Sequence, residues 1–436
     1  MIRRTVLEWQ SLRHGEAEDC IPDWAADRLS AVAKSSPLGG KEGARVLEQG
    51  RRQLRAQQVV GVIAAEGCSL EILPKIDFEG EVEGGASIAQ TRKQLVHMLA
   101  VALDMEIASG AVTDLGWQRE NLLEILIGLF SRKLADAVRQ GMPKRYLAHE
   151  EDLPALRGKL DVVPQFTRLA ASPDRLACRF DALSYDFVLN QIMKAAVMQL
   201  LRISRSEQNL RRLRELALVY ADISDQPVAQ LQWDAVILDR TNVRWRELIN
   251  LAKLLLGERF QTTSSGVGRG FSLLFEMNTL FEEYIARTLR RALSGTDFKV
   301  HAQGGGLFCL QHVQSGALRF KTAPDILVRR NGQVVMVIDT KWKRLSTQID
   351  DKKRGVAQSD IYQMMAYGRV YGCAELMLLY PHHRGLDRPE GKLDVHRVRG
   401  GNDMLTTATV DVSTRVEMLN RIHALVAPVC QREPSG

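Results

Sequence analysis

The sequence lacks several patterns that would place it in common protein classes. Its six cysteines are scattered and form no C-x-x-C pair, which argues against a zinc ribbon and fits a reducing compartment. No apolar run approaches the length of a membrane span, so we expect no membrane association. The opening stretch MIRRTVLEWQ has no continuous apolar segment after its basic residues, so we expect no secretory signal. These absences predict a cytoplasmic protein.

A nucleotide-binding loop is also missing. No G-x-x-x-x-G-K-[ST] pattern occurs, so we do not expect the chain to hydrolyse nucleotides by itself. What is present is an ordinary globular composition over 436 residues, enough for two or three domains. The net charge of +7 is compatible with nucleic acid as a partner without requiring one.

One stretch, Pro324 to Arg344 (PDILVRRNGQVVMVIDTKWKR), carries the strongest local signal. Asn331-Gly332 between β-branched runs predicts a hairpin, because both residues tolerate positive φ. The second strand is almost entirely apolar and then ends in Asp339 and Lys341. Side chains at i and i+2 point to the same face of a strand, so we expect these two to project together.

The same hairpin returns the chain to Asp325. A strict two-residue turn pairs Asp325 with Ile338, whereas a three-residue loop or one bulge places Asp325 directly across from Asp339. We predict the second arrangement. Two carboxylates and a lysine at one end of a sheet suit Mg²⁺-dependent hydrolysis of a phosphodiester, because Mg²⁺ asks for only one or two protein carboxylates.

The order P-D, spacer, D-x-K resembles the PD-(D/E)xK nuclease motif, which is a weak signal alone because any hairpin with polar ends can match it. A helix expected from Ser359 to Tyr371 strengthens it. Gln363 and Tyr367 lie four residues apart and share a face of that helix, as in the RecB-type branch of these nucleases. Ser359 or Asp360 is a plausible cap.

Upstream of the hairpin, Ser272 to Leu293 has the periodicity of a long amphipathic helix. In the nuclease family an acid on the preceding helix often completes the metal site, and the F-E-E-Y context favours Glu282. Glu276 and Glu283 are interpreted as residues of a solvated face.

Three segments are expected along the chain. Residues 1–165 form a β-rich N-terminal domain with a helix at 22–33 and strands at 59–63 and 69–73. Residues 166–265 form a helical connecting region, with helices at 180–203 and 246–256 after a polar connector at 143–155. Its arginine-rich run at 202–214 fits a solvated face or a contact with DNA phosphates. The Ser- and Gly-rich stretch at 261–270 reads as a linker, and 266–436 as the nuclease domain.

Taken in order, several segments resemble McrC, the nuclease subunit of McrBC-type modification-dependent (type IV) restriction systems. The matching segments are VVGVI (59–63), LEILPKI (70–76), LRGKLD (156–161), LACRFDALSYDFVLNQIMK (176–194), LLFEMNTLFEEYI (273–285), PDILV (324–328), IDTKWK (338–343) and DIYQMMAYG (360–368). This ordered series is far more specific than P-D and D-x-K alone.

The resemblance implies an α+β multidomain protein. Its C-terminal PD-(D/E)xK domain, like a restriction endonuclease, would have a central mixed sheet flanked by helices. Its N-terminal domain would dock on McrB, an AAA+ GTPase that forms rings, and stimulate GTP hydrolysis. The substrate would be modified, double-stranded DNA and the cofactor Mg²⁺. Metal ligands would be Asp325, Asp339, Glu282 and the Thr340 carbonyl, with Lys341 as catalytic lysine beside Gln363 and Tyr367.

Two other readings stay open at this point. The chain could be an activating or adaptor subunit with a vestigial nuclease site. The presence of Asp325, Asp339, Lys341 and Gln363 together argues against that decay. The third reading is a stand-alone repair nuclease of the RecB type, which needs no ring-forming partner.

Overall fold

A computed structural model gives the protein's structure. It describes residues 2–17, 19–39, 45–77, 88–105, 119–240, 242–257, 260–263, 270–346, 355–415 and 417–430. The chain divides into two compact units, one made of residues 1–123 and 259–436 and the other of residues 124–258. Among the residues described, no helix is long and apolar enough to cross a membrane.

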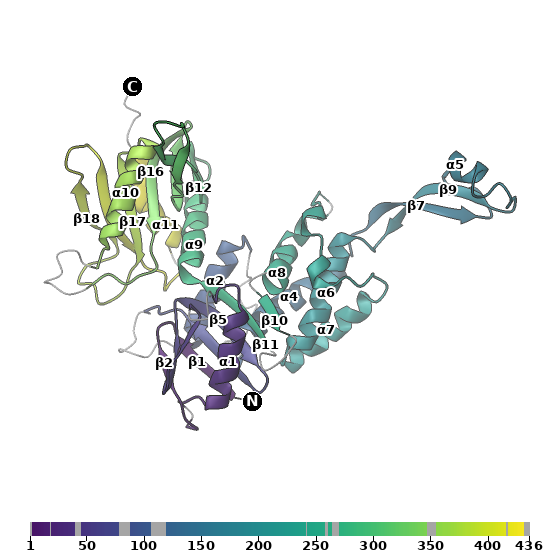
Figure 1. Cartoon of the computed structure of the whole chain (residues 1–436), viewed down its shortest axis with the longest axis horizontal. Helices are drawn as coiled ribbons and strands as arrows, with labels where there is room; N and C mark the ends of the chain where they lie inside the picture. Colours follow the sequence, from purple (N-terminus) through teal and green to yellow (C-terminus); the bar gives the residue numbers. More distant parts are fainter. Residues whose placement is uncertain are drawn as a thin grey trace. The chain divides into compact units, whose positions relative to one another are not determined.

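The N-terminal part of the first unit is built on a five-stranded sheet (Figure 1). In sheet order its strands are β1 (Ile2–Leu7), β6 (Cys68–Leu73), β5 (Val59–Ala65), β11 (Gly270–Glu276) and β10 (Phe260–Thr263). A smaller sheet is formed by β2 (Ser11–Arg13), β4 (Gln53–Ala56) and β3 (Leu47–Gln49). The predicted helix at 22–33 is α1 (Asp23–Ser35). These elements confirm a β-rich N-terminal region with one early helix.

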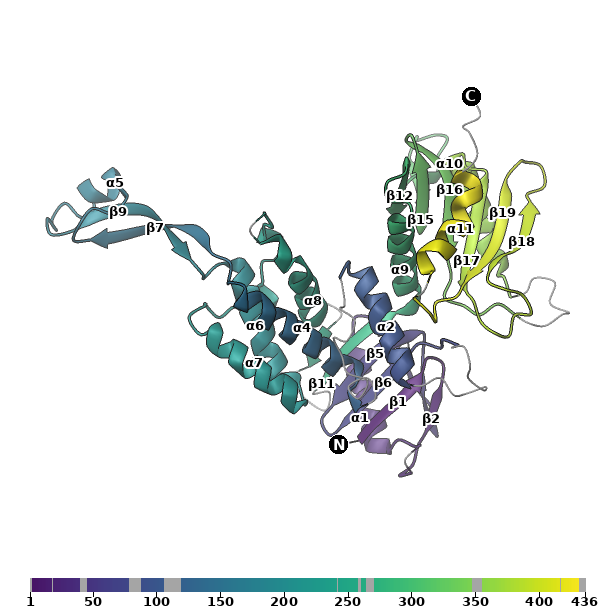
Figure 2. The same ribbon diagram turned by 180° about the vertical axis from the view of Figure 1, so that it is seen from behind.

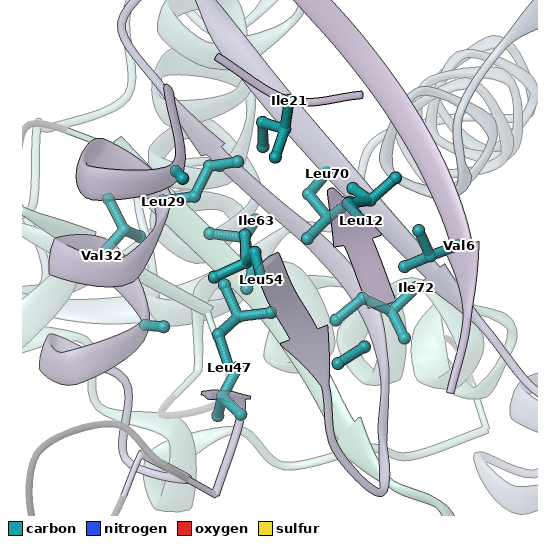
Figure 3. Packing of buried hydrophobic residues seen from close by; sticks show 14 of the residues in the cluster. Val6, Leu12, Ile21, Leu29, Val32, Leu47, Leu54, Ile63, Leu70 and Ile72 are labelled. Atoms are coloured by element: carbon teal, nitrogen blue, oxygen red, sulfur yellow. The ribbon is translucent and has the colours of Figure 1, made fainter. Parts of the chain in front are cut away.

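Helix α1 and the two sheets enclose one apolar core (Figure 3). Side chains alternate between the two faces of a strand, so the large aliphatic residues on the inward face of each strand form this core. Its labelled members are Val6, Leu12, Ile21, Leu29, Val32, Leu47, Leu54, Ile63, Leu70 and Ile72.

Strand β11 corrects the helix expected from Ser272. The segment Gly270–Glu276 pairs antiparallel with β5, and the helix α9 covers only Met277–Ala292. Gly61 permits this pairing, because a Cβ there would lie 1.9 Å from the Leu273 carbonyl oxygen. Pairing with a strand more than 200 residues earlier thus overrides the helical pattern of a short apolar run.

The expected linker at 261–270 is corrected in part for the same reason. Residues 260–263 form β10, Gly270 begins β11, and residues 264–269 lie outside the described part. Strands β10 and β11 both belong to the sheet of the N-terminal region. The domain boundary expected at residue 266 therefore falls between two strands of that sheet.

The C-terminal part of the first unit contains a six-stranded mixed sheet. Its strands, in sheet order, are β12 (Phe298–Ala302), β15 (Ile326–Arg330), β16 (Gln333–Thr340), β17 (Glu375–Pro381), β19 (Met404–Val410) and β18 (Gly391–Arg397). Strands β16, β17 and β19 run parallel, and the other neighbours run antiparallel. A separate hairpin is formed by β13 (Phe308–Gln311) and β14 (Leu318–Lys321).

Helices cover this sheet on two sides (Figures 1 and 2). Helix α10 (Gln358–Tyr371) packs on β16 and β17, while α9 packs against α11 (Met418–Cys430) and α2 (Ile88–Ala102). Helix α10 confirms the helix expected at 359–371. Its first flanking residue is Ala357 and no side chain caps it, so the expected Ser359 or Asp360 cap is wrong.

The second unit is more mixed than the helical region expected from sequence. Its helices are α4 (Leu122–Arg139, whose first two residues belong to the first unit), α5 (Val162–Phe166), α6 (Val188–Ile203), α7 (Glu207–Val219) and α8 (Arg246–Leu256), with short 3₁₀ turns at Val228–Gln230, Trp233–Ala235 and Val243–Trp245. Its strands are β7 (Arg145–Leu153), β8 (Lys159–Leu160) and β9 (Leu176–Ser184).

Two local expectations fail in this unit. The polar connector at 143–155 contains β7, and the first residues of the helix expected at 180–203 belong to β9, because the two strands pair along nine residues each. In the arginine-rich run, Arg202, Arg205, Arg211 and Arg214 are exposed, as on a solvated face.

Candidate active site

The hairpin of β15 and β16 sets the geometry of the site. Its turn residues Asn331 and Gly332 have φ of 51° and 84°, as the sequence predicts, and Arg330 pairs with Gln333. One bulge then shifts the register and leaves Val335 without a partner. Ile326 consequently pairs with Ile338, so the next opposed positions are Asp325 and Asp339. The predicted register is confirmed.

Asp339 is a buried carboxylate, 1% exposed, at the end of β16. The Lys341 ammonium lies 2.7 Å from its Oδ2 and 4.0 Å from Asp360 Oδ1. This confirms that the side chains at i and i+2 project together. Asp339 Oδ2 receives no well-directed hydrogen bond, so an ion-pair contact is its only polar partner among the described residues.

Asp325 is held by the neighbouring strand. Its Oδ2 accepts hydrogen bonds from the Thr340 backbone N–H at 2.7 Å and from the Thr340 hydroxyl at 2.9 Å. The resemblance implied a role for the Thr340 carbonyl alone. The Thr340 hydroxyl also fixes the orientation of the Asp325 carboxylate, a contact that no local pattern predicts because it crosses between strands.

Burial controls the charge of these acids. Burial, together with the charge of the nearby Asp325, raises the pKa of Asp339 to about 6, although Lys341 acts in the opposite direction. Burial also raises the pKa of Asp325, opposed by the bonds from Thr340. Burial lowers the pKa of Lys341, but its contact with Asp339 and the charges of Asp360 and Asp325 outweigh this, and the pKa lies above its usual value.

Glu282 approaches the same group from α9. Burial and the charges of Asp325, Glu283 and Asp339 together raise its pKa to about 7, although a hydrogen bond with Gln303 opposes them. Within the described part of the chain, however, no three Asp, Glu, His or Cys side chains are placed to hold one metal ion together. Glu282 as a direct metal ligand therefore stays a prediction.

Helix α10 contributes the two other expected residues. The Gln363 side-chain amide donates a 2.7 Å hydrogen bond to the Tyr367 hydroxyl, so the two do share a face. Tyr367 is 5% exposed. Burial raises its pKa, the bond from Gln363 lowers it, and the charges of Asp339 and Asp325 raise it. The tyrosine is therefore within electrostatic reach of both carboxylates.

Sequence reasoning missed Gln303. It follows β12 with a φ of 50°, donates its backbone N–H to the Asp325 carbonyl at 2.7 Å and bonds through its side chain to Glu282. A lone glutamine before three glycines carries no local signal for this position. Asp360, considered only as a helix cap, likewise lies near Lys341.

The donor set fits a divalent cation. A buried oxygen of Asp339 without a hydrogen bond, and two opposed carboxylates whose pKa values burial raises, form a site where added positive charge relieves the cost of ionisation. Oxygen ligands of this kind are those that Mg²⁺ selects.

Comparison with known proteins gives consistent matches. The family model described as McrBC 5-methylcytosine restriction system component matches residues 54–381. The chain is 20% identical over 277 residues to the type IV methyl-directed restriction enzyme EcoKMcrBC of Escherichia coli K12, which covers 60% of this chain and 77% of that protein.

Two solved structures from Thermococcus gammatolerans are also similar. One, a half-complex of McrB AAA+ hexamers with bound McrC from a tetradecameric assembly, matches with a TM-score of 0.69 and 22% identity, and covers 98% of this chain and 100% of that chain. The other, the McrBC complex determined by cryo-EM, matches with a TM-score of 0.52 and 25% identity, over 67% and 88% of the two chains. The first likeness shows the fold alone.

Proposed function

The chain belongs to the McrBC family of 5-methylcytosine restriction system components, and we propose that within such a system it is the Mg²⁺-dependent DNA endonuclease subunit. The observation that carries the proposal is the bulged hairpin, which opposes Asp325 and Asp339 and brings Lys341 to within 2.7 Å of Asp339. In this proposal the C-terminal part of the first unit is a PD-(D/E)xK nuclease domain.

The residues would divide the chemistry as follows. Asp325, Asp339 and the Thr340 carbonyl would hold Mg²⁺, which when bound polarises the phosphate and lowers the pKa of a coordinated water. Lys341, kept protonated by the adjoining carboxylates, would neutralise charge that develops on the phosphate. Glu282 would complete the coordination, directly or through a bound water.

Gln363 and Tyr367 would act at the edge of this centre. The hydrogen bond between them fixes the tyrosine hydroxyl beside the carboxylates, where it can orient a phosphate oxygen or the attacking water. We treat both as positioning residues.

We further propose that the chain binds and stimulates an McrB-like AAA+ GTPase ring and cleaves methylated foreign DNA in the cytoplasm. Support comes from two similar proteins, a methyl-directed restriction enzyme and an McrC bound to McrB hexamers. An adaptor without nuclease activity is the second candidate, favoured by the missing third direct carboxylate ligand in the described residues.

The test is to reconstitute the chain with an McrB-like AAA+ GTPase from the same genome. We expect complex formation, faster GTP hydrolysis, and Mg²⁺-dependent cleavage of methylated DNA. In Asp339→Ala, cleavage should fall at least a hundredfold while complex formation and GTP hydrolysis stay unchanged, because only the metal centre is altered. The exposed Asp387→Ala is the matched control.

The alternatives give different results. Accelerated GTP hydrolysis with no cleavage by the wild type would support the adaptor. Cleavage without any complex would support a stand-alone nuclease of the RecB type. Full cleavage by Asp339→Ala would overturn the catalytic assignment.

A further inference from the structure

A cavity of about 600 Å³ opens beside Lys341 within the first unit. Its walls come from several separate segments, among them the turn after β1 with Glu8 and Trp9, the start of α9 with Asn278, and the stretch after β16 with Trp342. Lys341 lines both this cavity and the carboxylate site, so the two spaces adjoin. The proposed metal chemistry does not use it.

Hydrogen bonds between distant segments build the walls. Trp342 donates its indole N–H to Glu8 Oε1 at 2.7 Å and its backbone N–H to Asn278 Oδ1 at 3.0 Å. Gln58 donates to the Trp342 carbonyl at 2.9 Å. The Lys75 backbone N–H also donates to Glu8 Oε1, at 2.9 Å. The cavity is therefore pre-formed, as ligand sites usually are.

The lining has the chemistry that binds a nucleotide. Four basic residues face two acidic ones there, and the basic set is Lys75, Lys341, Lys343 and Arg344. Lys75 is exposed, so its ammonium can reach a phosphate. The Trp9 ring is 46% exposed, with the Arg55 guanidinium 5.7 Å from its centroid. An exposed indole offers a stacking surface for a base.

One feature of this wall is costly unless a ligand uses it. Trp9 has a φ of 65°, a conformation that is a clear outlier for a bulky residue. Glu8 is only 4% exposed, and its Oε1 accepts the bonds from Trp342 and Lys75 that hold the wall together. A ligand in the cavity therefore meets this part of the wall through the Trp9 ring.

We propose that this cavity holds one nucleotide of the DNA strand next to the scissile phosphate. The base, turned out of the duplex stack, lies against Trp9, and Lys75 contacts the flanking phosphate. The inference rests on the proposed nuclease function, because a strand with its phosphate at Lys341 must continue into adjoining space, and successive phosphates follow within a few ångströms.

The test is photocrosslinking in the complex of full-length chain, AAA+ partner and methylated duplex, with Ca²⁺ in place of Mg²⁺ to hold the DNA uncut. 5-Iododeoxycytidine is placed in turn at each of the positions flanking the cut. We expect one or two adjoining positions to crosslink to the Trp9 peptide, identified by mass spectrometry. The crosslink should disappear in Trp9→Ala and persist in Trp24→Ala.

Kinetics with Mg²⁺ provide a second readout. Trp9→Ala should raise KM for DNA about tenfold and leave kcat within about twofold, because stacking of one base is lost and the metal centre is intact. Trp24→Ala is the matched control, since Trp24 is 42% exposed, has Arg28 5.1 Å from its ring and does not line the cavity. Trp9→Phe should restore most of the affinity.

Failure of this inference can be told apart from failure of the proposed function. Crosslinks that map only to other peptides, with normal cleavage by Trp9→Ala, overturn the nucleotide site and leave the nuclease standing. If the wild type gives no crosslink at Trp9 and Trp9→Ala loses partner binding, the cavity belongs to a surface that binds protein. That result also overturns the nucleotide site. A wild-type complex that crosslinks at Trp9 but never cleaves DNA supports the site and overturns the nuclease.

Discussion

Asp339 is a side chain that, when ionised, destabilises the metal-free folded chain. It ends a strand whose apolar residues are buried by pairing on both sides, and no protein donor fully compensates its charge. Its raised pKa, about 6, records that ionisation is less favourable in the folded chain than in water. Such a perturbed group beside a second carboxylate is typical of a functional site.

The sign of the resulting pH dependence follows directly. The folded pKa lies above that of the unfolded chain, so both states bind the proton at low pH, and the metal-free fold loses stability as the pH rises through about 6. Without divalent cations, Asp339→Asn should therefore raise the free energy of unfolding at pH 8 by roughly 1–3 kcal/mol, and by little at pH 4.

Thermal denaturation in EDTA measures this effect, with the exposed Asp387→Asn as control. Added Mg²⁺ should reverse the order, because it stabilises only the chain that keeps the carboxylate. A lower melting temperature for Asp339→Asn than for the wild type in EDTA at pH 8 would contradict the account.

At the scale of elements, the hairpin depends on one extra residue. The two-residue turn alone would pair Asp325 with Ile338 and send the two carboxylates to opposite faces. Val335, which has no partner, corrects the register by one position. The turn was recognisable from Asn331-Gly332, and the need for a bulge followed from the chemistry expected of the acids. The position of the bulge, opposite the step from Val328 to Arg329 on the facing strand, could not be predicted from the sequence.

Deletion of Val335 tests this dependence. With Val335 removed, the two-residue turn still pairs Arg329 with Val334 and Val328 with Met336, so Asp325 stays opposite Asp339 and cleavage should stay within about threefold of the wild type. Removal of both Val334 and Val335 shifts the facing strand by one position and sends the two carboxylates to opposite faces, so cleavage should fall at least a hundredfold while the circular dichroism is largely retained. An inactive but folded single deletion, or an active double deletion, would count against the register as the cause.

Other elements show where local pattern is a poor guide. Residues 246–256 are helical as predicted, because their periodicity agrees with their packing. The segment Ser272–Glu276 has similar apolar content, yet it forms a strand because β5 offers it an edge. Residues 145–153 contain charged side chains along a strand, and their pairing with β9 leaves most of them exposed. Polarity alone therefore suggested a connector.

At the scale of the whole molecule, the chain leaves the N-terminal sheet and returns to it. Strands β10 and β11 complete that sheet after the entire second unit has intervened. The first unit thus combines sequence from both ends of the chain. A division at 165/166 and 265/266, as expected from composition, differs from the compact units, which change at 123/124 and 258/259.

Calorimetry should detect these two units. We expect two unfolding transitions, because each unit has its own buried residues and the first is closed by strand pairing between its ends. Added Mg²⁺ should raise the temperature of one transition only, and Arg92→Met should lower the same one, because the buried pair of Arg92 with Glu71 lies in the first unit.

The exposed ion pair of Arg139 with Asp136 in the second unit provides the control. Arg139→Met should change the free energy of unfolding of either unit by no more than about 1 kcal/mol. A single transition that shifts as a whole with Mg²⁺ would show instead that the units unfold together.

The sequence by itself determined what depends on near neighbours: the Asn-Gly turn, the apolar strand that ends in Asp339 and Lys341, and the shared face of Gln363 and Tyr367. These follow from backbone sterics and from the two- and 3.6-residue periods, which act within a few residues. Tertiary structure alone decided the pairing of β11 with β5, the contact of Gln303 with Glu282, and the bond from Trp342 to Glu8. The partners in these contacts are brought together only when the core is buried, and no local pattern records which distant segment will meet which.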